Sequence, residues 1–392
     1  MSPFVRSRST PRRRATRQIA LAVVAAAALA ACAGSAPASE PTSAGTAAPD
    51  APTTTAYTTD AERIAASVAL FSSITPDQPG CSVAVAREGV VVWSAAFGAA
   101  SLDPLTPLTT DSIVDIGSTS KQFTATAIAL LVQRGVLNLS DKLATWMPAL
   151  PAWAQTVTIE QMVHHTSGIP DYLFLLLDEG ALLTAVSTDA DALRVLTAAT
   201  ALEFTPGDHF SYSNSNYFLL GQIVQQATGE PLQRFVQREV FDAAGMVAVM
   251  DPTAMPPTKA RSYRKEGGRW KPADSPWSEV GDGGVQTTPT QLALWATQYW
   301  APTVGGADIN TQRFHDAAVD PASGGRYGFG IGELAVGDLR VLSHGGSWGG
   351  FVTTFVVAPD LHLAVAGTCT AAESAPTTPS GDPGLTVLQI WA

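Results

Sequence analysis

The sequence carries little charge and lacks a hydrophobic run long enough to cross a bilayer as a helix. Only 15% of its 392 residues are charged, whereas 46% are hydrophobic. The N-terminal apolar run, Ile19–Ala31, is shorter than the roughly 20 residues that a membrane-spanning helix needs. Fixed-period repeats, coiled-coil heptads and an internal membrane helix are also missing from the pattern. The length therefore allows one large or two ordinary globular domains.

An excess of positive charge is also missing outside the first 18 residues. The chain holds 23 basic and 34 acidic residues, and residues 1–18 contribute six arginines and no acid. Without those arginines, 17 basic and 34 acidic residues remain, which gives a net charge of −17. Such a charge opposes binding to nucleic acid and to anionic lipid surfaces, so we expect no nucleic-acid partner.

The N-terminus has the order of a secretory signal: a basic segment, a short apolar run and small residues. Leu29-Ala30-Ala31-Cys32 resembles a bacterial lipobox, so residues 1–31 are a predicted lipoprotein signal peptide and Cys32 is the predicted lipidation site. An ordinary signal with an incidental cysteine is the alternative. Arg12-Arg13-Arg14 leaves the choice between Sec and twin-arginine export open. We expect an exported protein, lipid-anchored to the outer face of the bacterial cell membrane.

The rest of the chain divides into a tether and a folded domain. Residues 32–60 are mostly Ala, Pro, Ser, Thr and Gly, a composition that cannot bury a core and predicts a flexible tether. The folded domain should comprise residues 61–392. Its pattern favours a strand hairpin at 81–93, a largely helical stretch at 136–284 and a meander of strands at 340–368.

A serine and a lysine lie at the start of a predicted long helix. Apolar residues at three- and four-residue spacing predict this helix over residues 119–134, with Gly135 after its end. Ser118 then lies at or near the helix N-terminus, where unpaired N–H groups favour developing negative charge. Lys121, three residues on, can reach the serine oxygen. Ser-x-x-Lys suits a nucleophile with its base, although an N-cap beside a surface lysine has the same pattern.

Three further polar segments stand out. Tyr212 and Asn214 are two residues apart in a turn-rich segment, so both can point into one cleft, although a packed tyrosine at a helix entry is the alternative. His344-Gly345-Gly346 lies between predicted strands, where glycine allows close backbone approach. The adjacent His164 and His165 have no third ligand at a metal-like spacing, so we expect no metal site.

Together these segments resemble the serine β-lactamase and penicillin-binding protein superfamily, on its class C and DD-peptidase side. The matching motifs are Ser118-x-x-Lys121, Tyr212-Ser213-Asn214 and His344-Gly345-Gly346, supported by residues 162–169 and 283–288, all in the family's order. The resemblance implies an α/β (α+β) fold. Its five-stranded antiparallel sheet would be built from residues 81–97 and 326–369 and flanked by helices. An all-helical subdomain at about 116–284 would be inserted into it, with the cleft between the two.

The resemblance also implies roles for individual residues. Ser118 would be the nucleophile that forms an acyl-enzyme, and Lys121 and Tyr212 would together act as the general base. Asn214 would orient Lys121 and the substrate amide. His344 stands where most class C enzymes have lysine. The oxyanion hole would consist of the backbone N–H groups of Ser118 and Ser347, next to Gly346. No cofactor or metal is implied, and we expect a monomer.

The substrate stays open at this stage. A D-Ala-D-Ala-type peptidase or penicillin-interactive hydrolase of the cell envelope comes first, a small-ester esterase second and a β-lactamase third. A lipoprotein that binds peptidoglycan without turnover is the non-enzymatic alternative, and the intact motifs count against it. The terminal carboxylate of a carboxypeptidase substrate would need a cationic side chain near the third motif. Arg326 and Arg340 are candidates, but Glu333 lies in the same region.

Two cysteines remain once Cys32 is assigned to lipid. In an exported protein oxidation is permitted, so Cys81 and Cys369 can pair. In the implied fold their strands are antiparallel neighbours, and opposite residues lie within reach of a disulfide. We therefore predict a Cys81–Cys369 disulfide, with two buried thiols as the alternative.

Overall fold

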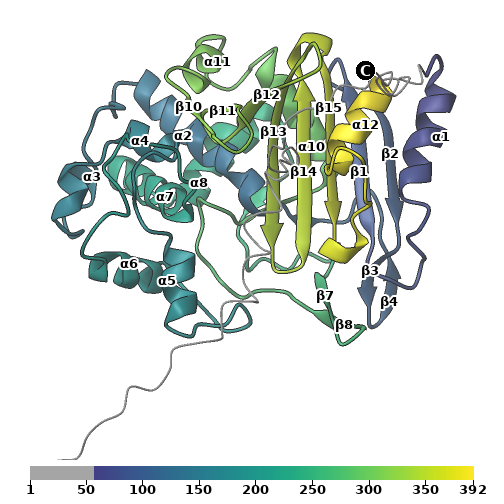
Figure 1. Ribbon diagram of the computed structural model, residues 1–392, viewed down its shortest axis with the longest axis horizontal. Coiled ribbons are helices and arrows are strands. Elements are labelled where there is room, and N and C mark those ends of the chain that lie inside the picture. Colours follow the sequence, from purple (N-terminus) through teal and green to yellow (C-terminus); the bar gives the residue numbers. More distant parts are fainter. Residues whose placement is uncertain (1–56) are drawn as a thin grey trace, which may run out of the picture.

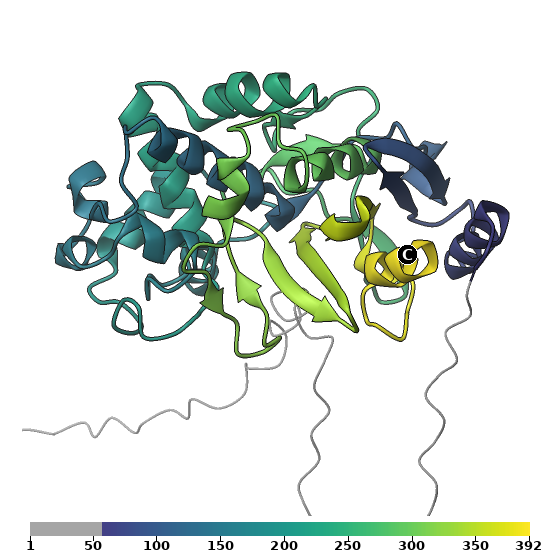
Figure 2. The same ribbon diagram turned by 90° about the horizontal axis from the view of Figure 1, so that it is seen from above.

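The computed structural model describes residues 57–392. The predicted signal peptide, Cys32 and nearly all of the predicted tether lie outside the described residues. A central antiparallel sheet separates a large group of helices from two terminal helices, α1 (Asp60–Leu70) and α12 (Pro383–Trp391) (Figure 1; Figure 2 gives the view from above). None of the helices in this part of the chain has the length and apolarity to span a membrane.

The sheet has eight strands, and all its neighbouring pairs are antiparallel. The expected fold class is confirmed, but the expected number of five strands is wrong. Two of the three additional strands are only two residues long each, too short to produce a recognisable alternation in the sequence. In spatial order the strands are β10 (Ala318–Val319), β11 (Arg326–Tyr327), β12 (Gly332–Val336), β13 (Leu339–Trp348), β14 (Phe351–Ala358), β15 (Leu363–Cys369), β1 (Cys81–Arg87) and β2 (Val90–Phe97).

The middle of the sheet is buried on both faces because helices cover each side. Val83 and Val85 of β1 join the core beneath α1 and α12, whereas Ala84 and Ala86 face the larger core with α10 (Pro289–Trp295). Alternate residues of a strand point to opposite faces of the sheet, so the same strand contributes side chains to both cores. This double burial explains the nearly continuous apolar sequences of β1 and β15.

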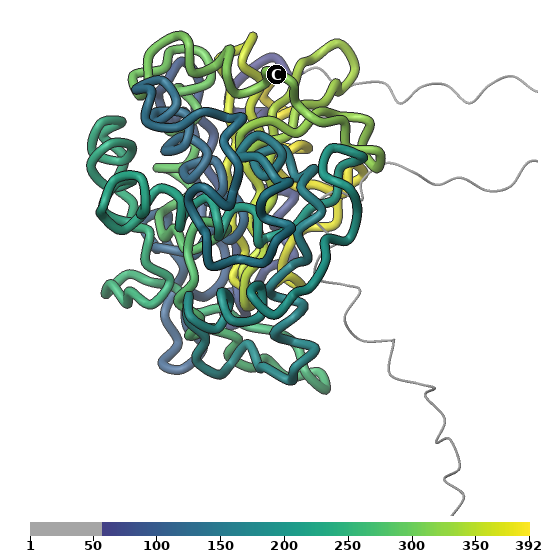
Figure 3. The backbone as a smooth tube through the Cα atoms, turned by 90° about the vertical axis from the view of Figure 1, so that its left-hand side faces the viewer, coloured from purple at the N-terminus to yellow at the C-terminus, as the bar shows by residue number. Residues whose placement is uncertain are grey.

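The helical group lies between β5 (Val114–Asp115) and β9 (Val285–Thr287), which pair with each other and so bring its two ends together. Figure 3 is viewed from the side of this group. At its centre, residues 121–131 of α2 are all buried, against α7 and α8. Its elements are η1 (Gly117–Ser120), α2 (Lys121–Gln133), α3 (Leu143–Trp146), η2 (Ala152–Gln155), α4 (Ile159–Val163), α5 (Tyr172–Asp178), α6 (Asp189–Ala198), α7 (Asn214–Thr228), α8 (Leu232–Val236), η3 (Gln237–Phe241) and α9 (Asp242–Ala244).

The segment at 116–284 is not purely helical, contrary to the expectation. It also contains β6 (Val249–Met250) and a hairpin of β7 (Tyr263–Glu266) and β8 (Arg269–Pro272). The hairpin turns at Gly267-Gly268, where both residues have positive φ angles, 55° and 78°. Adjacent glycines favour such a turn. The remaining elements are β3 (Ala99–Leu102), β4 (Leu105–Pro107), η4 (Ala296–Tyr299), α11 (Asp308–Arg313), η5 (Pro359–Leu361) and η6 (Ala372–Ser374).

A disulfide joins the first and last long strands of the domain. Cys81 of β1 lies directly opposite Cys369 of β15 in the antiparallel register, and their Cα atoms are 3.9 Å apart. The structure thus contains the disulfide predicted from the fold that the family resemblance implied, rather than two separate thiols.

Candidate active site

Ser118 lies in the short turn η1, pressed against strand β13. A Cβ atom added to Gly346 would lie 1.9 Å from the carbonyl oxygen of Ile116, and one added to Gly117 would lie 2.7 Å from the amide nitrogen of Ser347. Gly117 also has a φ of +53°, which side chains other than glycine rarely adopt. The two glycines therefore let η1 and β13 make direct backbone contact. This contact sets Ser118 beside the strand that carries the third motif.

Lys121 is fully buried and holds the serine. Its Nζ atom lies 3.0 Å from Ser118 Oγ, 2.8 Å from Asn214 Oδ1 and 2.7 Å from the Asp282 carbonyl oxygen. Burial lowers the pKa of Lys121 to about 8, against the raising effect of the Asp282 and Asp171 charges. Asn214 Oδ1 and the carbonyl can only accept hydrogen bonds. A neutral Lys121 therefore keeps two N–H groups for them and directs its lone pair at the Ser118 hydroxyl.

Asp171 fixes the orientation of Asn214, a role that the motifs did not reveal. Its Oδ2 atom accepts hydrogen bonds from both the backbone N–H and the side-chain Nδ2 of Asn214, each 2.9 Å long. The amide oxygen of Asn214 is thereby turned toward Lys121. Asp171 is also the N-cap of α5, where its Oδ1 accepts from the backbone N–H of Leu173. That capping position was the available signal in the sequence, but it indicates a helix start rather than a functional residue.

Tyr212 covers the other side of Lys121, whose Nζ atom lies 4.9 Å from the centre of the phenol ring. The hydroxyl is buried and has no hydrogen-bond partner within the described part of the chain. Burial raises the pKa of Tyr212 well above its usual value, and the nearby Ser118 hydroxyl only partly opposes this. The structure thus brings Ser118, Lys121, Tyr212 and Asn214 together, and Lys121 is the one bonded to the serine oxygen.

His344 is neutral and engaged within the protein. Its Nδ1 atom lies 2.6 Å from the Gly345 carbonyl oxygen, which can only accept, so Nδ1 carries the proton. Its Nε2 atom then accepts from the Tyr327 hydroxyl, 2.9 Å away. Burial and the Lys121 charge lower the pKa of His344 to about 4. His344 therefore supplies no positive charge near neutral pH, and both of its nitrogens already have partners.

The two arginines considered as carboxylate anchors are paired elsewhere. Arg326 and Arg340 both form ion pairs with Glu333, and Arg326 Nε lies 2.8 Å from its carboxylate. Both guanidinium groups also lie over the ring of Phe314. Neither arginine is left to bind a substrate carboxylate without giving up these contacts.

Two carboxyl groups, those of Asp282 and Asp171, act on the charge of Lys121. Burial raises the pKa of Asp115 and of Asp282 to about 6, and that of Glu279 to about 7. Each carboxyl has a hydrogen bond inside the protein: from Gly117 N–H, from the Tyr172 hydroxyl and from the Ser187 hydroxyl, respectively. The charges of Asp282 and Asp171 act on Lys121, whereas the Asp115 carboxyl interacts with the charge of Lys259. The two carboxylates near Lys121 oppose a negatively charged substrate group.

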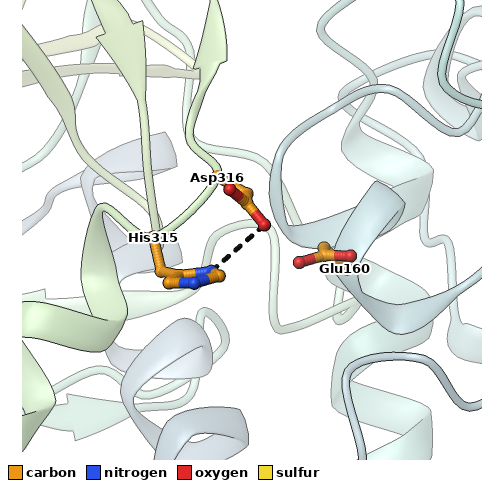
Figure 4. Close-up of side chains that lie close together, drawn as sticks. All are labelled: Glu160, His315 and Asp316. Atoms are coloured by element: carbon orange, nitrogen blue, oxygen red, sulfur yellow. Dashed lines mark ion pairs between the residues drawn. The ribbon is translucent and has the colours of Figure 1, made fainter.

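One group of side chains among the described residues could offer three metal ligands. Glu160, His315 and Asp316 have ligand atoms within 4.8 Å of one another, with His315 paired to Asp316 (Figure 4). His315 and Asp316 are exposed, a setting in which such groups are common without an ion. The group includes neither His164, whose Nδ1 atom contacts the Tyr327 carbonyl, nor His165.

The geometry agrees with comparison to known proteins. The family model described as Beta-lactamase matches residues 61–386. The chain belongs to the β-lactamase family. It is a serine hydrolase of the superfamily that also holds the penicillin-binding proteins, as its relatives show.

Relatives within this β-lactamase family include peptidases. The chain is 34% identical over 166 residues to Penicillin-binding protein 4* of Bacillus subtilis, covering 42% of this chain and 36% of that protein. It is 28% identical over 294 residues to a D-aminopeptidase of Cereibacter sphaeroides, covering 73% of this chain and 56% of that protein. The chain thus spans between about a third and just over half of the length of these relatives.

Solved structures share the fold of this chain. An octameric penicillin-binding protein homologue from Pyrococcus abyssi has a TM-score of 0.71 and 23% identity, covering 84% of this chain and 75% of that one. A D-amino acid amidase from Ochrobactrum anthropi SV3 has a TM-score of 0.69 and 20% identity, covering 84% of this chain and 98% of that one. At these identities the likeness supports the fold alone.

Proposed function

We propose that this enzyme hydrolyses amide bonds in small amides and short peptides whose acyl part is a D-amino acid with a free amine. The observation that carries the proposal is the charge around the site. Arg326 and Arg340 are bound to Glu333, His344 is neutral, and the charges of two carboxyl groups, Asp282 and Asp171, act on Lys121. A substrate ammonium is favoured in such a field and a substrate carboxylate is opposed. The names of the D-aminopeptidase and D-amino acid amidase relatives support the same substrate class.

The proposed reaction uses the groups in the order that their bonds suggest. Neutral Lys121 takes the proton of Ser118 as its oxygen attacks the substrate carbonyl. The backbone N–H groups of Ser118 and Ser347 hold the oxyanion. Tyr212 passes its proton to the leaving amine and regains one from the Lys121 ammonium, which restores the neutral lysine. Lys121 then takes a proton from the water that attacks the ester on Ser118 and returns it to the serine oxygen, which releases the D-amino acid.

A substrate panel tests the proposal. The panel comprises D- and L-aminoacyl p-nitroanilides, N-acylated D-Ala-D-Ala peptides, p-nitrophenyl esters and a chromogenic cephalosporin. We expect the largest kcat/KM among the amides for the D-aminoacyl anilides with a free amine. Ser118→Ala should lose turnover by several orders of magnitude and lose fluorophosphonate labelling, as removal of a nucleophile does. A higher kcat/KM on the N-acylated D-Ala-D-Ala peptides would instead restore the carboxypeptidase assignment.

An esterase acting on small neutral esters is the second candidate, and the pairing of Arg326 and Arg340 with Glu333 favours it as well. Esters are intrinsically more reactive than amides, so a faster ester rate does not separate the two. Stereochemistry does, because a D-amino acid hydrolase must distinguish D- from L-aminoacyl esters. Equal kcat/KM for the two enantiomers, with no measurable anilide hydrolysis, would assign the esterase activity.

A further inference from the structure

His165 lies behind Tyr212, and the reaction described above makes no use of it. Its side chain is fully buried, and its ring stacks on the Tyr212 ring with centroids 4.2 Å apart and planes 28° from parallel. Its backbone has a φ of 55°, in the left-handed region that residues other than glycine seldom occupy. A strained conformation persists only where the surrounding structure holds it in place. The position of His165 is therefore closely determined.

Hydrogen bonds join His165 to the residues on both sides of Tyr212. The carbonyl oxygen of His165 accepts from the backbone N–H of Ser211, at 2.8 Å. Its Nδ1 atom accepts from the backbone N–H of Ser213, at 3.2 Å, and from Nδ2 of Asn216, at 3.1 Å. His165 thus contacts the residue before Tyr212, the residue after it and the Tyr212 ring itself.

These partners also determine the protonation of His165. Both groups at Nδ1 donate, so Nδ1 must present a lone pair and the neutral ring carries its proton on Nε2. Burial lowers the pKa of His165 well below its ordinary value, and a positive charge on Lys121 lowers it further. The other titratable groups packed on the ring are the phenols of Tyr212, Tyr217 and Tyr327. A neutral imidazole can act as a permanent acceptor here, which a charged one cannot.

We propose that His165 is a positioning residue for Tyr212. It holds the phenol against Lys121 and Ser118 through two separable contacts, the Nδ1 acceptor and the ring stack. This inference rests on the serine hydrolase chemistry of the family and not on the D-amino acid substrate. Its test therefore uses a simple p-nitrophenyl ester and a fluorophosphonate label, so that a failure here is distinguishable from a failure of the substrate assignment.

Three variants separate the contacts. His165→Asn keeps an acceptor at the position of Nδ1 and tolerates the positive φ, but it removes the ring. His165→Phe keeps a ring and leaves the N–H groups of Ser213 and Asn216 without an acceptor. Tyr212→Phe removes the hydroxyl that His165 is proposed to position. Each variant is assayed for kcat, KM, labelling rate and melting temperature, and His165→Phe is also combined with Tyr212→Phe.

A positioning role predicts non-additive kinetics. We expect His165→Phe to lower kcat about a hundredfold with KM changed by less than about threefold, and His165→Asn to recover about tenfold of that loss. In the background of Tyr212→Phe, His165→Phe should cost little more, because the group it positions is already absent. Multiplying losses in the double variant, or equal losses for His165→Asn and His165→Phe, would overturn the proposal. If His165→Phe yields no folded protein, His165→Gln replaces it, since its amide extends past the Nδ1 position.

Discussion

Lys121 is held by groups that differ in what they can do with a proton. Asn214 Oδ1 and the Asp282 carbonyl only accept, whereas the Ser118 hydroxyl can donate as well. Asp171 secures this arrangement because it accepts hydrogen bonds from the backbone N–H and from the side-chain Nδ2 of Asn214. The second bond prevents the side-chain amide from turning round. The residues around the lysine thereby direct its one free lone pair to the nucleophile.

The pH dependence of acylation follows from this arrangement. Burial lowers the pKa of Lys121 to about 8, and only the neutral amine can accept the serine proton. The neutral fraction grows as pH rises, so the labelling rate of Ser118 should increase about tenfold per pH unit below pH 8 and level off above it. Fluorophosphonate labelling measured from pH 6 to pH 9 checks this. Circular dichroism over the same range provides the control for folding, and a flat labelling profile would remove Lys121 as the base.

Asp171 also shows why part of the site escapes sequence reasoning. Ser118, Lys121, Tyr212 and Asn214 stand in short motifs whose residue types suit the chemistry, so they could be singled out without a structure. Asp171 acts through a contact with Asn214, 43 residues away, that is made only after the helices pack. The pairing of Arg326 and Arg340 with Glu333 could not be predicted from the sequence either. It depends on which side chains of neighbouring strands lie on the same face of the sheet.

Among the secondary-structure elements, hydrophobic periodicity predicted the long central helix but missed short strands. The helix predicted over residues 119–134 is confirmed as η1 followed by α2, and Gly135 follows its end with a φ of 66°. The two-residue strands β10 and β11, and the hairpin of β7 and β8, were missed. Short strands are formed by pairing with neighbours rather than by their own pattern, and that pairing is a property of the fold.

The contact between η1 and β13 makes a prediction about Gly346. Alanine there would place its Cβ 1.9 Å from the Ile116 carbonyl oxygen, so the two backbones must separate. We expect Gly346→Ala to lower kcat/KM at least about a hundredfold and to destabilise the fold by about 1–3 kcal/mol, the usual cost of overpacking. Ester hydrolysis and thermal unfolding measure the two effects.

A matched control lies in the same sheet. A Cβ on Gly332 of β12 would meet its nearest atom, the Ser343 carbonyl oxygen, at 3.4 Å, which is an ordinary contact. Gly332→Ala should therefore leave both the activity and the melting temperature close to those of the parent. Equal activity for the Gly346 and Gly332 variants would show that the contact between η1 and β13 does not set the position of Ser118.

At the scale of the whole molecule, the disulfide closes a loop that holds almost all of the domain. Cys81 and Cys369 are separated by 288 positions. The chain-entropy model allows a stabilisation of about 5–6 kcal/mol for so long a loop. Replacing both cysteines by serine should therefore lower the free energy of unfolding by up to this amount, measured by denaturant titration. A double variant as stable as the parent, or an intact mass that does not rise by two hydrogens on reduction, would contradict a functional bond.

The predicted lipid anchor is a separate property of the chain, and we propose it on residues 1–32 alone. Cells expressing the full chain and fed a labelled fatty acid should incorporate the label into the protein and retain it in the membrane fraction. Cys32→Ala should abolish both, because the thiol is the acceptor. Label incorporation that persists in this variant would place the lipid elsewhere, and a protein without label would restore the ordinary secretory signal.

The position of the disulfide bears on how the enzyme would survive a protease. Because the bond ties the first long strand of the domain to the last, residues 81–369 form a covalent ring, and residues 1–80 and 370–392 are its two ends. A single cut in any loop of that ring opens it without releasing a fragment. The strands on either side of the cut stay at high local concentration, as linked modules do. Nicked enzyme would run as one species on a gel until it is reduced, and the domain could lose a peptide bond before it loses its active site.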